Sequence, residues 1–337
     1  MPFLIIDMKD KNRTNGLPCY LRYKKLFLKM KILSLIILIF YIVISISDIH
    51  SQSKVAFTFD DPQTEETPLL SWQEKNDSIL NTLERNNIRT TLFVCGHRVS
   101  DDAGNELLLS WDSKGHQISN HSFLHKYYHS EKFSYDDFKT DFLKNDSLIN
   151  SFDNYTKLFR FPYLKEGNTL IKRDSARALL KQRNYKEGYV AIDASDWYVN
   201  QLLTDTLKLN SETDFSIYKK IYAEHILERA KFYDSLATLL TGRKVKLVLL
   251  LHHNISSALF LEDLIQTFYY NNWEIISSEE AWTDPVYSEF PDILPAGESI
   301  IWALAKQSGK FEDILRYPGE DSEYEEVKFR EIINASH

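Results

Sequence analysis

The chain has 337 residues, of which 43% are hydrophobic and 26% are charged. This composition is that of an ordinary globular protein, and it excludes disorder, collagen and coiled coil as descriptions of the whole chain. Residues 1–51 carry a net charge of +5 and the whole chain carries −8, which leaves −13 for residues 52–337. An acidic main body argues against binding to nucleic acid or to an anionic membrane surface.

Residues 1–51 have the pattern of an export signal. Lysine residues precede an uncharged apolar run from Ile32 to Ser47, as a positive region precedes the hydrophobic core of a signal peptide. The run is just longer than a usual signal core and just shorter than the ~18 residues of a spanning helix. We expect a cleaved signal peptide, with a retained membrane anchor as the alternative, and a true start at Met30.

Residues 52–282 alternate short apolar runs with longer amphipathic ones. The short runs, many of them β-branched, predict seven buried strands: Lys54–Phe59, Thr90–Val94, His116–Ser119, Lys157–Phe161, Tyr189–Ile192, Lys246–Leu251 and Trp273–Ser277. Helical spacing of apolar residues predicts the helices between them: Trp72–Asn86, Asp101–Lys114, Tyr135–Phe152, Ile171–Arg183, Phe215–Leu240 and Ala258–Tyr270. Strands that alternate with helices predict a parallel sheet covered by helices. Seven units favour a distorted (β/α)7 barrel over an open sheet.

The pattern weakens after Ser277, where proline residues interrupt it. One further helix is expected at Ser299–Gln307. We therefore interpret residues 283–337 as an extension packed on the barrel and not as a second domain.

Polar residues follow the predicted strands at the end where such a barrel carries its function. The first strand ends in two adjacent carboxylates, Asp60 and Asp61. The third is followed by His121 and His125, whose spacing places both on one face of a helical turn and suits the binding of one metal ion. An acidic pair alone often caps a helix, and a lone histidine pair is more often a chance surface feature.

Three further strands deliver polar residues at the same end. Arg160 leaves the fourth strand, and an arginine there can hold a carboxylate. Asp193 and Asp196 follow the fifth strand, and His252 and His253 follow the very apolar sixth. A single buried histidine is usually structural, but five successive signals at one face of one fold are poorly explained in that way.

These residues form five ordered motifs and cover roughly Lys54 to Ser277. The motifs are Thr58-Phe-Asp60-Asp61, His121-Ser-Phe-Leu-His125, Arg160-Phe-Pro-Tyr163, Asp193-Ala-Ser-Asp196-Trp197 and Leu249-Leu-Leu-His252. In these motifs the sequence resembles the polysaccharide deacetylase family of metal-dependent carbohydrate esterases. Each motif alone is weak or moderate, whereas five in order with matching strand context are specific. The resemblance implies a distorted barrel of β/α units, in agreement with the predicted strands.

The resemblance also implies a role for each matching residue. Asp61, His121 and His125 would bind a divalent metal, most simply Zn²⁺, with Co²⁺, Ni²⁺ or Mn²⁺ as alternatives. Asp60 would be the general base and Arg160 would hold it. The backbone N–H of Tyr163 would donate to the oxyanion, and Tyr163 would also contact the substrate. His252 would be the general acid, and Asp196 would orient it. Trp197 would form a wall of the substrate groove.

The sequence departs from the family pattern in two places. Pro62 follows Asp61 where the family usually has glycine, which changes the turn after this ligand without removing it. His253 stands where an acidic residue often follows the catalytic histidine, so His253 remains an alternative to His252 as the acid. Two histidines and one carboxylate leave an open position on a zinc-like ion, which supports metal-assisted hydrolysis independently.

The sequence thus predicts an exported hydrolase that removes acetyl groups from a poly- or oligosaccharide. The expected substrate is an N-acetylhexosamine polymer such as peptidoglycan or a chitin-like glycan. The alternatives are an O-acetyl xylan esterase, a metal-dependent amidase for a small non-sugar C–N bond, and a non-catalytic carbohydrate-binding relic. Contact with a membrane is expected only through an uncleaved N-terminal segment, and the protein is expected in the periplasm, in the cell envelope or outside the cell.

Overall fold

The computed structural model describes residues 29–33, 52–315 and 322–334. The chain divides into one unit from Met1 to Ser51 and a second from Gln52 to His337. In the first unit only a helical turn at 29–33 is described, so most of the predicted apolar signal lies outside the described residues. Within the described ranges, no helix has the length and apolarity needed to cross a membrane.

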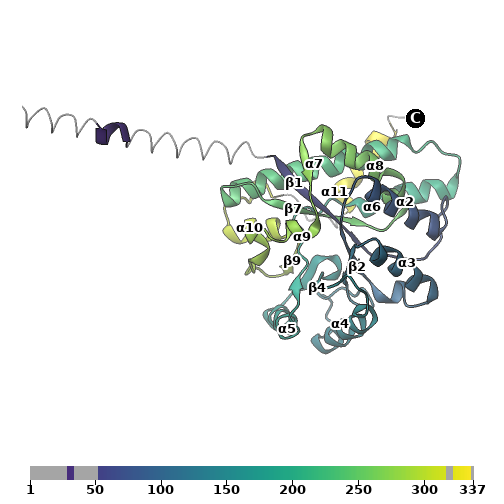
Figure 1. Cartoon of the computed structure of the whole chain (residues 1–337), viewed down its shortest axis with the longest axis horizontal. Coiled ribbons are helices and arrows are strands. Elements are labelled where there is room, and N and C mark those ends of the chain that lie inside the picture. The colour runs from purple at the N-terminus through teal and green to yellow at the C-terminus, as the bar shows by residue number, and fades with distance from the viewer. Residues whose placement is uncertain (1–28, 34–51, 316–321, 335–337) are drawn as a thin grey trace, which may run out of the picture. The chain divides into compact units, whose positions relative to one another are not determined.

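A curled sheet of seven parallel strands lies at the centre of the second unit (Figure 1). Its order is β6-β4-β3-β2-β1-β7, with β8 also paired to β1. The strands are β1 (Ser53–Asp60), β2 (Thr91–Val94), β3 (Gln117–Asn120), β4 (Tyr155–Phe159), β6 (Lys186–Glu187), β7 (Lys246–His252) and β8 (Trp273–Ile275). β1 pairs with β7 along one side, while β2 and β8 share its other side. This arrangement confirms the predicted distorted barrel of parallel strands.

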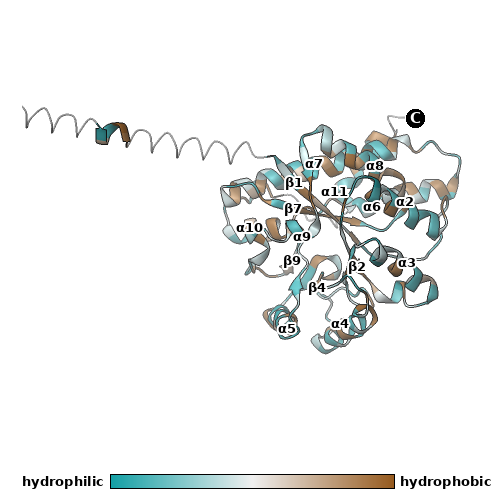
Figure 2. Cartoon of the chain, viewed as in Figure 1, coloured by the Kyte–Doolittle hydropathy of each residue, from teal (hydrophilic) through white to brown (hydrophobic). Residues whose placement is uncertain are grey.

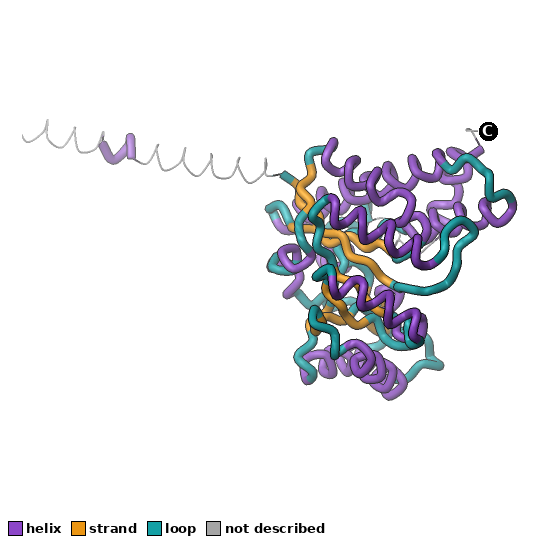
Figure 3. The backbone as a smooth tube through the Cα atoms, turned by 45° about the vertical axis from the view of Figure 1, so that its right-hand side comes forward, coloured by secondary structure: helices purple, strands orange, loops and turns teal. Residues whose placement is uncertain are grey.

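Helices cover the outside of this sheet (Figures 1 and 3). They are α2 (Trp72–Arg85), α3 (Asp102–Ser113), α4 (Tyr135–Ile149), α5 (Leu170–Gln182), α6 (Asp196–Leu209), α7 (Ser216–Thr241) and α8 (Ile255–Tyr270). Local chemistry fixes several starts: Ser71 and Ser134 each form a capping box with the acidic residue three positions later. Six of these helices match predicted ones to within a few residues, whereas α6 was not predicted.

The apolar sequence of β7 explains its place at the centre of the core. Leu247, Val248, Leu249 and Leu251 are fully buried between β1 and the surrounding helices, and Figure 2 shows the hydrophobic colouring of the central strands. Such a strand is buried on both faces, as a parallel strand under helices must be. The strand therefore carries His252, its last residue, to the edge of a rigid core.

One predicted strand is wrong. Tyr189–Ile192 makes only an isolated bridge between Ile192 and Leu249 of β7. The N–H groups of Ala191 and Ile192 both donate to the Val248 carbonyl, and the Val190 carbonyl accepts from Ile300, so no regular ladder forms. The polar pair Lys186–Glu187 forms the fifth strand instead. The fourth strand, β4, is shifted by two residues toward the N-terminus relative to its predicted range.

The last described segments return to the barrel. They comprise α9 (Ser278–Ala281), the 3₁₀ turn η3 (Pro285–Ser288), β9 (Ala296–Gly297), α10 (Ile300–Ser308) and α11 (Ser322–Asn334). β9 pairs antiparallel with β5 (Lys165–Gly167), and α10 and α11 both contact α7. Gly297 has a φ of +127°, and a Cβ there would meet the Leu164 carbonyl oxygen at 2.0 Å. The α10 helix lies within one residue of its predicted range, and α11 was not predicted.

Candidate active site

A cavity of about 330 Å³ opens at the carboxyl ends of the parallel strands. Twelve residues line it: Asp60, Asp61, Arg98, His121, His125, Phe161, Tyr163, Leu164, Asp193, Trp197, Leu250 and His252. Seven of the nine predicted site residues are among them. The other two, Arg160 and Asp196, lie behind the cavity wall, where they contact Asp60 and His252.

The loops that carry these side chains hold unusual backbone conformations. Asp61, His125, Tyr163 and Ser195 all have φ between 51° and 57°, in the left-handed region. Such conformations cost about 1–3 kcal/mol each in residues other than glycine, and they persist only where the surrounding structure enforces them. The predicted site residues Asp61, His125 and Tyr163 are therefore held by their surroundings in positions that the free chain would avoid.

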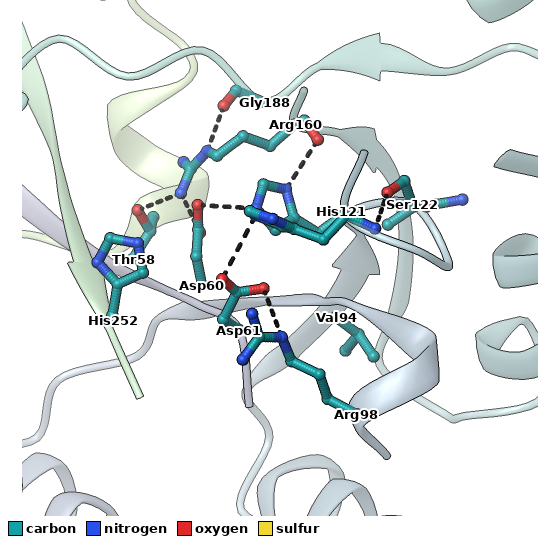
Figure 4. Close-up of polar contacts among 12 residues, drawn as sticks. Thr58, Asp60, Asp61, Val94, Arg98, His121, Ser122, Arg160, Gly188 and His252 are labelled. Atoms are coloured by element: carbon teal, nitrogen blue, oxygen red, sulfur yellow. Dashed lines mark hydrogen bonds and ion pairs between the residues drawn. The ribbon is translucent and has the colours of Figure 1, made fainter. Parts of the chain in front are cut away.

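Asp61, His121 and His125 form a cluster with the donor set of a metal site. One potential ligand atom from each lies within 4.8 Å of the others. Asp61 Oδ2 is 3.4 Å from His125 Nε2, and the two imidazole rings are 4.9 Å apart. His121 donates from Nδ1 to the Arg160 carbonyl at 2.8 Å, which leaves the Nε2 lone pair facing the site (Figure 4).

The protonation of this cluster suits a cation. Burial lowers the pKa of His121 and of His125 to about 4, so both imidazoles are neutral at pH 7, the form that binds a metal ion. Burial alone would raise the pKa of Asp61, but His125, His121 and the Arg98 guanidinium hold it below its ordinary value. The residues present therefore fit a divalent ion held by two imidazoles and one carboxylate.

Asp60 is placed beside this cluster and paired with Arg160. Arg160 Nη1 donates to Asp60 Oδ1 at 2.5 Å, and both side chains are at most 2% exposed. Two further bonds hold the guanidinium, to Thr58 Oγ1 at 3.0 Å and to the Gly188 carbonyl at 2.9 Å (Figure 4). Burial raises the pKa of Asp60 to about 6 against the opposing effect of Arg160. Asp60 is therefore mostly ionised at neutral pH and close to the pKa that suits a general base.

His252 and Asp196 form a second buried pair. Asp196 Oδ1 accepts from His252 Nδ1 at 2.7 Å, and its Oδ2 accepts from the His252 backbone N–H at 2.9 Å. Burial favours the neutral imidazole, but Asp196 outweighs it and raises the pKa of His252 to about 9. Asp60 and His252 occupy paired positions at the ends of β1 and β7, so a proton acceptor and a proton donor lie on adjacent strands.

His253 points away from the cavity into the core. It is 1% exposed, its Nε2 lies 3.3 Å from Asn76 Oδ1, and its ring packs edge-on against Trp111. Burial keeps its pKa well below the ordinary value, so the ring is neutral. Of the two alternatives from the sequence, only His252 faces the cavity.

Aromatic side chains line the mouth of the cavity. Tyr163 is 47% exposed, and its ring lies 4.7 Å from that of His125. Tyr127, also exposed, packs edge-on against Tyr163 at 5.6 Å. Trp197, in the first turn of α6, contributes a further wall. The position of Tyr127, two residues after the candidate ligand His125, was not singled out from the sequence.

Sequence reasoning also missed Arg98. It lies in η1 (Gly96–Arg98), directly after β2, and lines the cavity beside Asp61. The position of Arg98 at the carboxyl end of a parallel strand was the one feature of the sequence that could have indicated a role, and none of the five motifs includes it.

A sequence model of the polysaccharide deacetylase family matches residues 48–186. This range contains the first three motifs, and the fourth and fifth follow it along the chain. Residues 48–186 thus match the polysaccharide deacetylase family, and the rest of the chain lies outside this match.

Several solved structures are similar to this chain. A mutant of a Bacillus anthracis family 4 pseudoenzyme with restored enzymatic activity is 15% identical, with 68% of each chain covered and a TM-score of 0.48. The family 4 carbohydrate esterase from Streptomyces lividans, in complex with acetate, is 19% identical and covers 68% of this chain and 95% of its own, with a TM-score of 0.44. A mutant of the peptidoglycan deacetylase PdaC from Bacillus subtilis is 19% identical, with 69% and 93% covered and a TM-score of 0.44. No curated protein matches the chain.

Proposed function

We propose that this protein is a divalent-metal-dependent deacetylase of N-acetylhexosamine units in a glycan such as peptidoglycan or a chitin-like polymer. The observation that carries the proposal is the composition of one cavity. It brings together a three-residue metal cluster, an ionised carboxylate in Asp60 and a protonated imidazole in His252. Hydrolysis of an amide by metal-activated water uses all three functions, and it needs the acid because the amine leaves poorly unless it is protonated.

A metal ion held by Asp61, His121 and His125 would supply a Lewis acid that acidifies water and polarises the acetyl carbonyl. Asp60, kept ionised by Arg160, takes the proton from the attacking water. The backbone N–H of Tyr163 donates to the oxygen on which negative charge develops. His252 then delivers its proton to the departing nitrogen, while Asp196 keeps the imidazole oriented and stabilises its charge.

The walls of the cavity support an acetylated sugar as the substrate. Phe161, Leu164 and Leu250 give it an apolar surface against which an acetyl methyl group can pack. Tyr163 and Trp197 present aromatic faces at the mouth, where sugar rings can stack. The cavity keeps all three potential metal ligands and the carboxylate of Asp60. A non-catalytic binding relic would have no need to keep these residues, so their presence argues against that alternative.

We further propose that the protein is exported, on the basis of the lysine-rich and apolar leader in residues 24–47. Fractionation of cells, with N-terminal sequencing of the mature protein, tests this proposal. A mature N-terminus near residue 51 in an envelope or extracellular fraction would support it, and full-length protein in the cytoplasm would refute it.

A panel of substrates tests the proposed chemistry. We expect acetate release from N-acetylglucosamine oligomers at a higher kcat/KM than from acetylated xylan, and no hydrolysis of small cyclic amides. A preference for xylan would reassign the enzyme to O-acetyl esters, and hydrolysis of the cyclic amide alone would exclude a sugar substrate. Asp60→Asn is the matched control for each substrate, because it removes the base and keeps the shape of the side chain.

A further inference from the structure

The two oxygens of the Asp61 carboxylate face different partners. Oδ2 points to the metal cluster, 3.4 Å from His125 Nε2. Oδ1 points away from it to Arg98, whose Nε lies 3.6 Å away (Figure 4). Both Oδ1 and this Nε are buried, and neither forms a hydrogen bond within the described residues. Arg98 is thus the cation that faces the outer oxygen of a metal-ligand carboxylate.

Arg98 also holds the loop that follows Asp61. Its Nη1 donates to the side-chain oxygen of Gln63 at 2.9 Å, so one guanidinium contacts two residues of the loop across Pro62. Lys75 secures the same loop from beneath by donating to the Gln63 carbonyl at 3.1 Å and to the Glu65 carbonyl at 3.3 Å. Lys75 is fully buried, so its bonds anchor the loop to α2.

This anchoring has a local reason. Asp61 has a φ of 57°, a left-handed conformation that costs about 1–3 kcal/mol outside glycine. The following residue is proline, which cannot donate a backbone hydrogen bond to hold the turn. The turn is instead held by the Asp61 N–H bond to the Phe93 carbonyl and by the contacts of Arg98. Arg98 therefore supplies from η1 a second restraint next to Pro62, which has no N–H group to donate.

We propose that Arg98 is a positioning residue that orients Asp61 for metal binding, a role that extends the proposed metal dependence. By pairing with Oδ1, it turns Oδ2 toward the two histidines and fixes the loop at Gln63. Mutation of a residue that holds a metal ligand in place typically lowers the metal affinity by about 10–100-fold. The positive charge of Arg98 also repels a cation at the site. If orientation dominates, removal of Arg98 weakens metal binding, and if repulsion dominates, its removal strengthens metal binding.

The test is a measurement of Zn²⁺ affinity by competition with a fluorescent chelator, on the full chain after the metal has been removed. We expect Arg98→Met to raise the Kd for Zn²⁺ by about 10–100-fold. Gln63→Leu should raise it by a smaller factor, because it removes the anchor of the guanidinium and leaves the charge. Arg89→Met is the control: Arg89 precedes β2 at its opposite end and bonds the Gly115 carbonyl, and its loss should leave the Kd unchanged.

A double-mutant cycle identifies the route of the effect. If Arg98 acts through Asp61, Arg98→Met should weaken Zn²⁺ binding much less in an Asp61→Asn background than in the wild type. Thermal unfolding of the metal-free variants separates this effect from a loss of fold. An unchanged or tighter Kd in a folded Arg98→Met protein would overturn the proposal, as would an equal effect in both backgrounds.

These readouts do not depend on the substrate. A wild type that binds Zn²⁺ and releases no acetate from sugar oligomers would refute the proposed function and leave the role of Arg98 testable by affinity. A wild type that binds no Zn²⁺ would overturn the role of Arg98 together with the metal site.

Discussion

Replacing Asp196 with asparagine should change the protonation of His252 and leave its position nearly intact. The asparagine side chain has the same shape, so its oxygen can still accept from Nδ1 where Asp196 now accepts at 2.7 Å. The negative charge that stabilises the imidazolium is lost. Burial of His252 remains, and burial favours the neutral ring. Asp60 and Asp61 still favour the charged ring, so the pKa of His252 should fall from about 9 toward the ordinary histidine value of 6.5.

The size of the effect follows from these two values. The sign is set by the general acid, which must be protonated to act, so activity is lost as the pH rises through its pKa. At pH 8 a pKa of about 9 leaves about 90% of the ring protonated, and a pKa of 6.5 leaves about 3%. Asp196→Asn should therefore lower kcat/KM by up to about thirtyfold at pH 8. At a pH well below the lowered pKa both proteins carry the protonated ring, so their rates should approach each other.

Two assays measure this effect. NMR titration of the imidazole in the metal-free protein gives the pKa of His252 directly, and the pH profile of acetate release gives the alkaline limb of kcat/KM. We expect both to move to lower pH, by up to about two units. A profile lowered by one constant factor at every pH would refute the reasoning, since it would show that Asp196 only orients the ring. An unchanged titration of His252 would refute it as well.

Other substitutions test the remaining assignments. Asp60→Asn should lower kcat by about 10²–10⁴-fold in a steady-state assay, and near-normal turnover would exclude Asp60 as the base. His252→Gln should lower kcat similarly, whereas His253→Gln should leave kcat intact and reduce the free energy of unfolding by about 1–3 kcal/mol in a denaturant titration; the reverse pattern would exchange their roles. Trp197→Ala should raise KM for sugar oligomers with little change in kcat, and a fall in kcat alone would argue against a groove wall.

The central strands of the fold were predictable because their continuous apolar sequences indicate that both faces of each strand are buried. Runs such as Leu247–Leu251 can only lie between two covered faces, and their order predicts the parallel sheet. The pairing of β5 with β9 was not predictable, since it joins two- and three-residue strands about 130 residues apart. Tyr189–Ile192 misled because its β-branched, apolar sequence reports burial correctly but says nothing of how its backbone is paired.

The candidate site was predictable where one motif supplies several residues, and less so where contacts cross the fold. The structure brings His121, His125 and Asp61 together as predicted. The predicted helical turn is wrong, because residues 121–125 form no helix and His125 has a φ of 52°. The choice between His252 and His253 needed the structure, because adjacent residues of a strand point to opposite faces and the sequence does not fix the register. Arg98 carries no motif, and only its distance from Asp61 reveals it.

Restoration of activity by a metal ion is the most direct test of the proposed metal-dependent deacetylation. The protein is stripped of metal, and acetate release from N-acetylglucosamine oligomers is measured before and after addition of Zn²⁺ or Co²⁺, with Asp60→Asn alongside. We expect no release without metal, recovery with it, and none in Asp60→Asn under either condition. Full activity of the metal-free protein, or equal activity of Asp60→Asn, would contradict it.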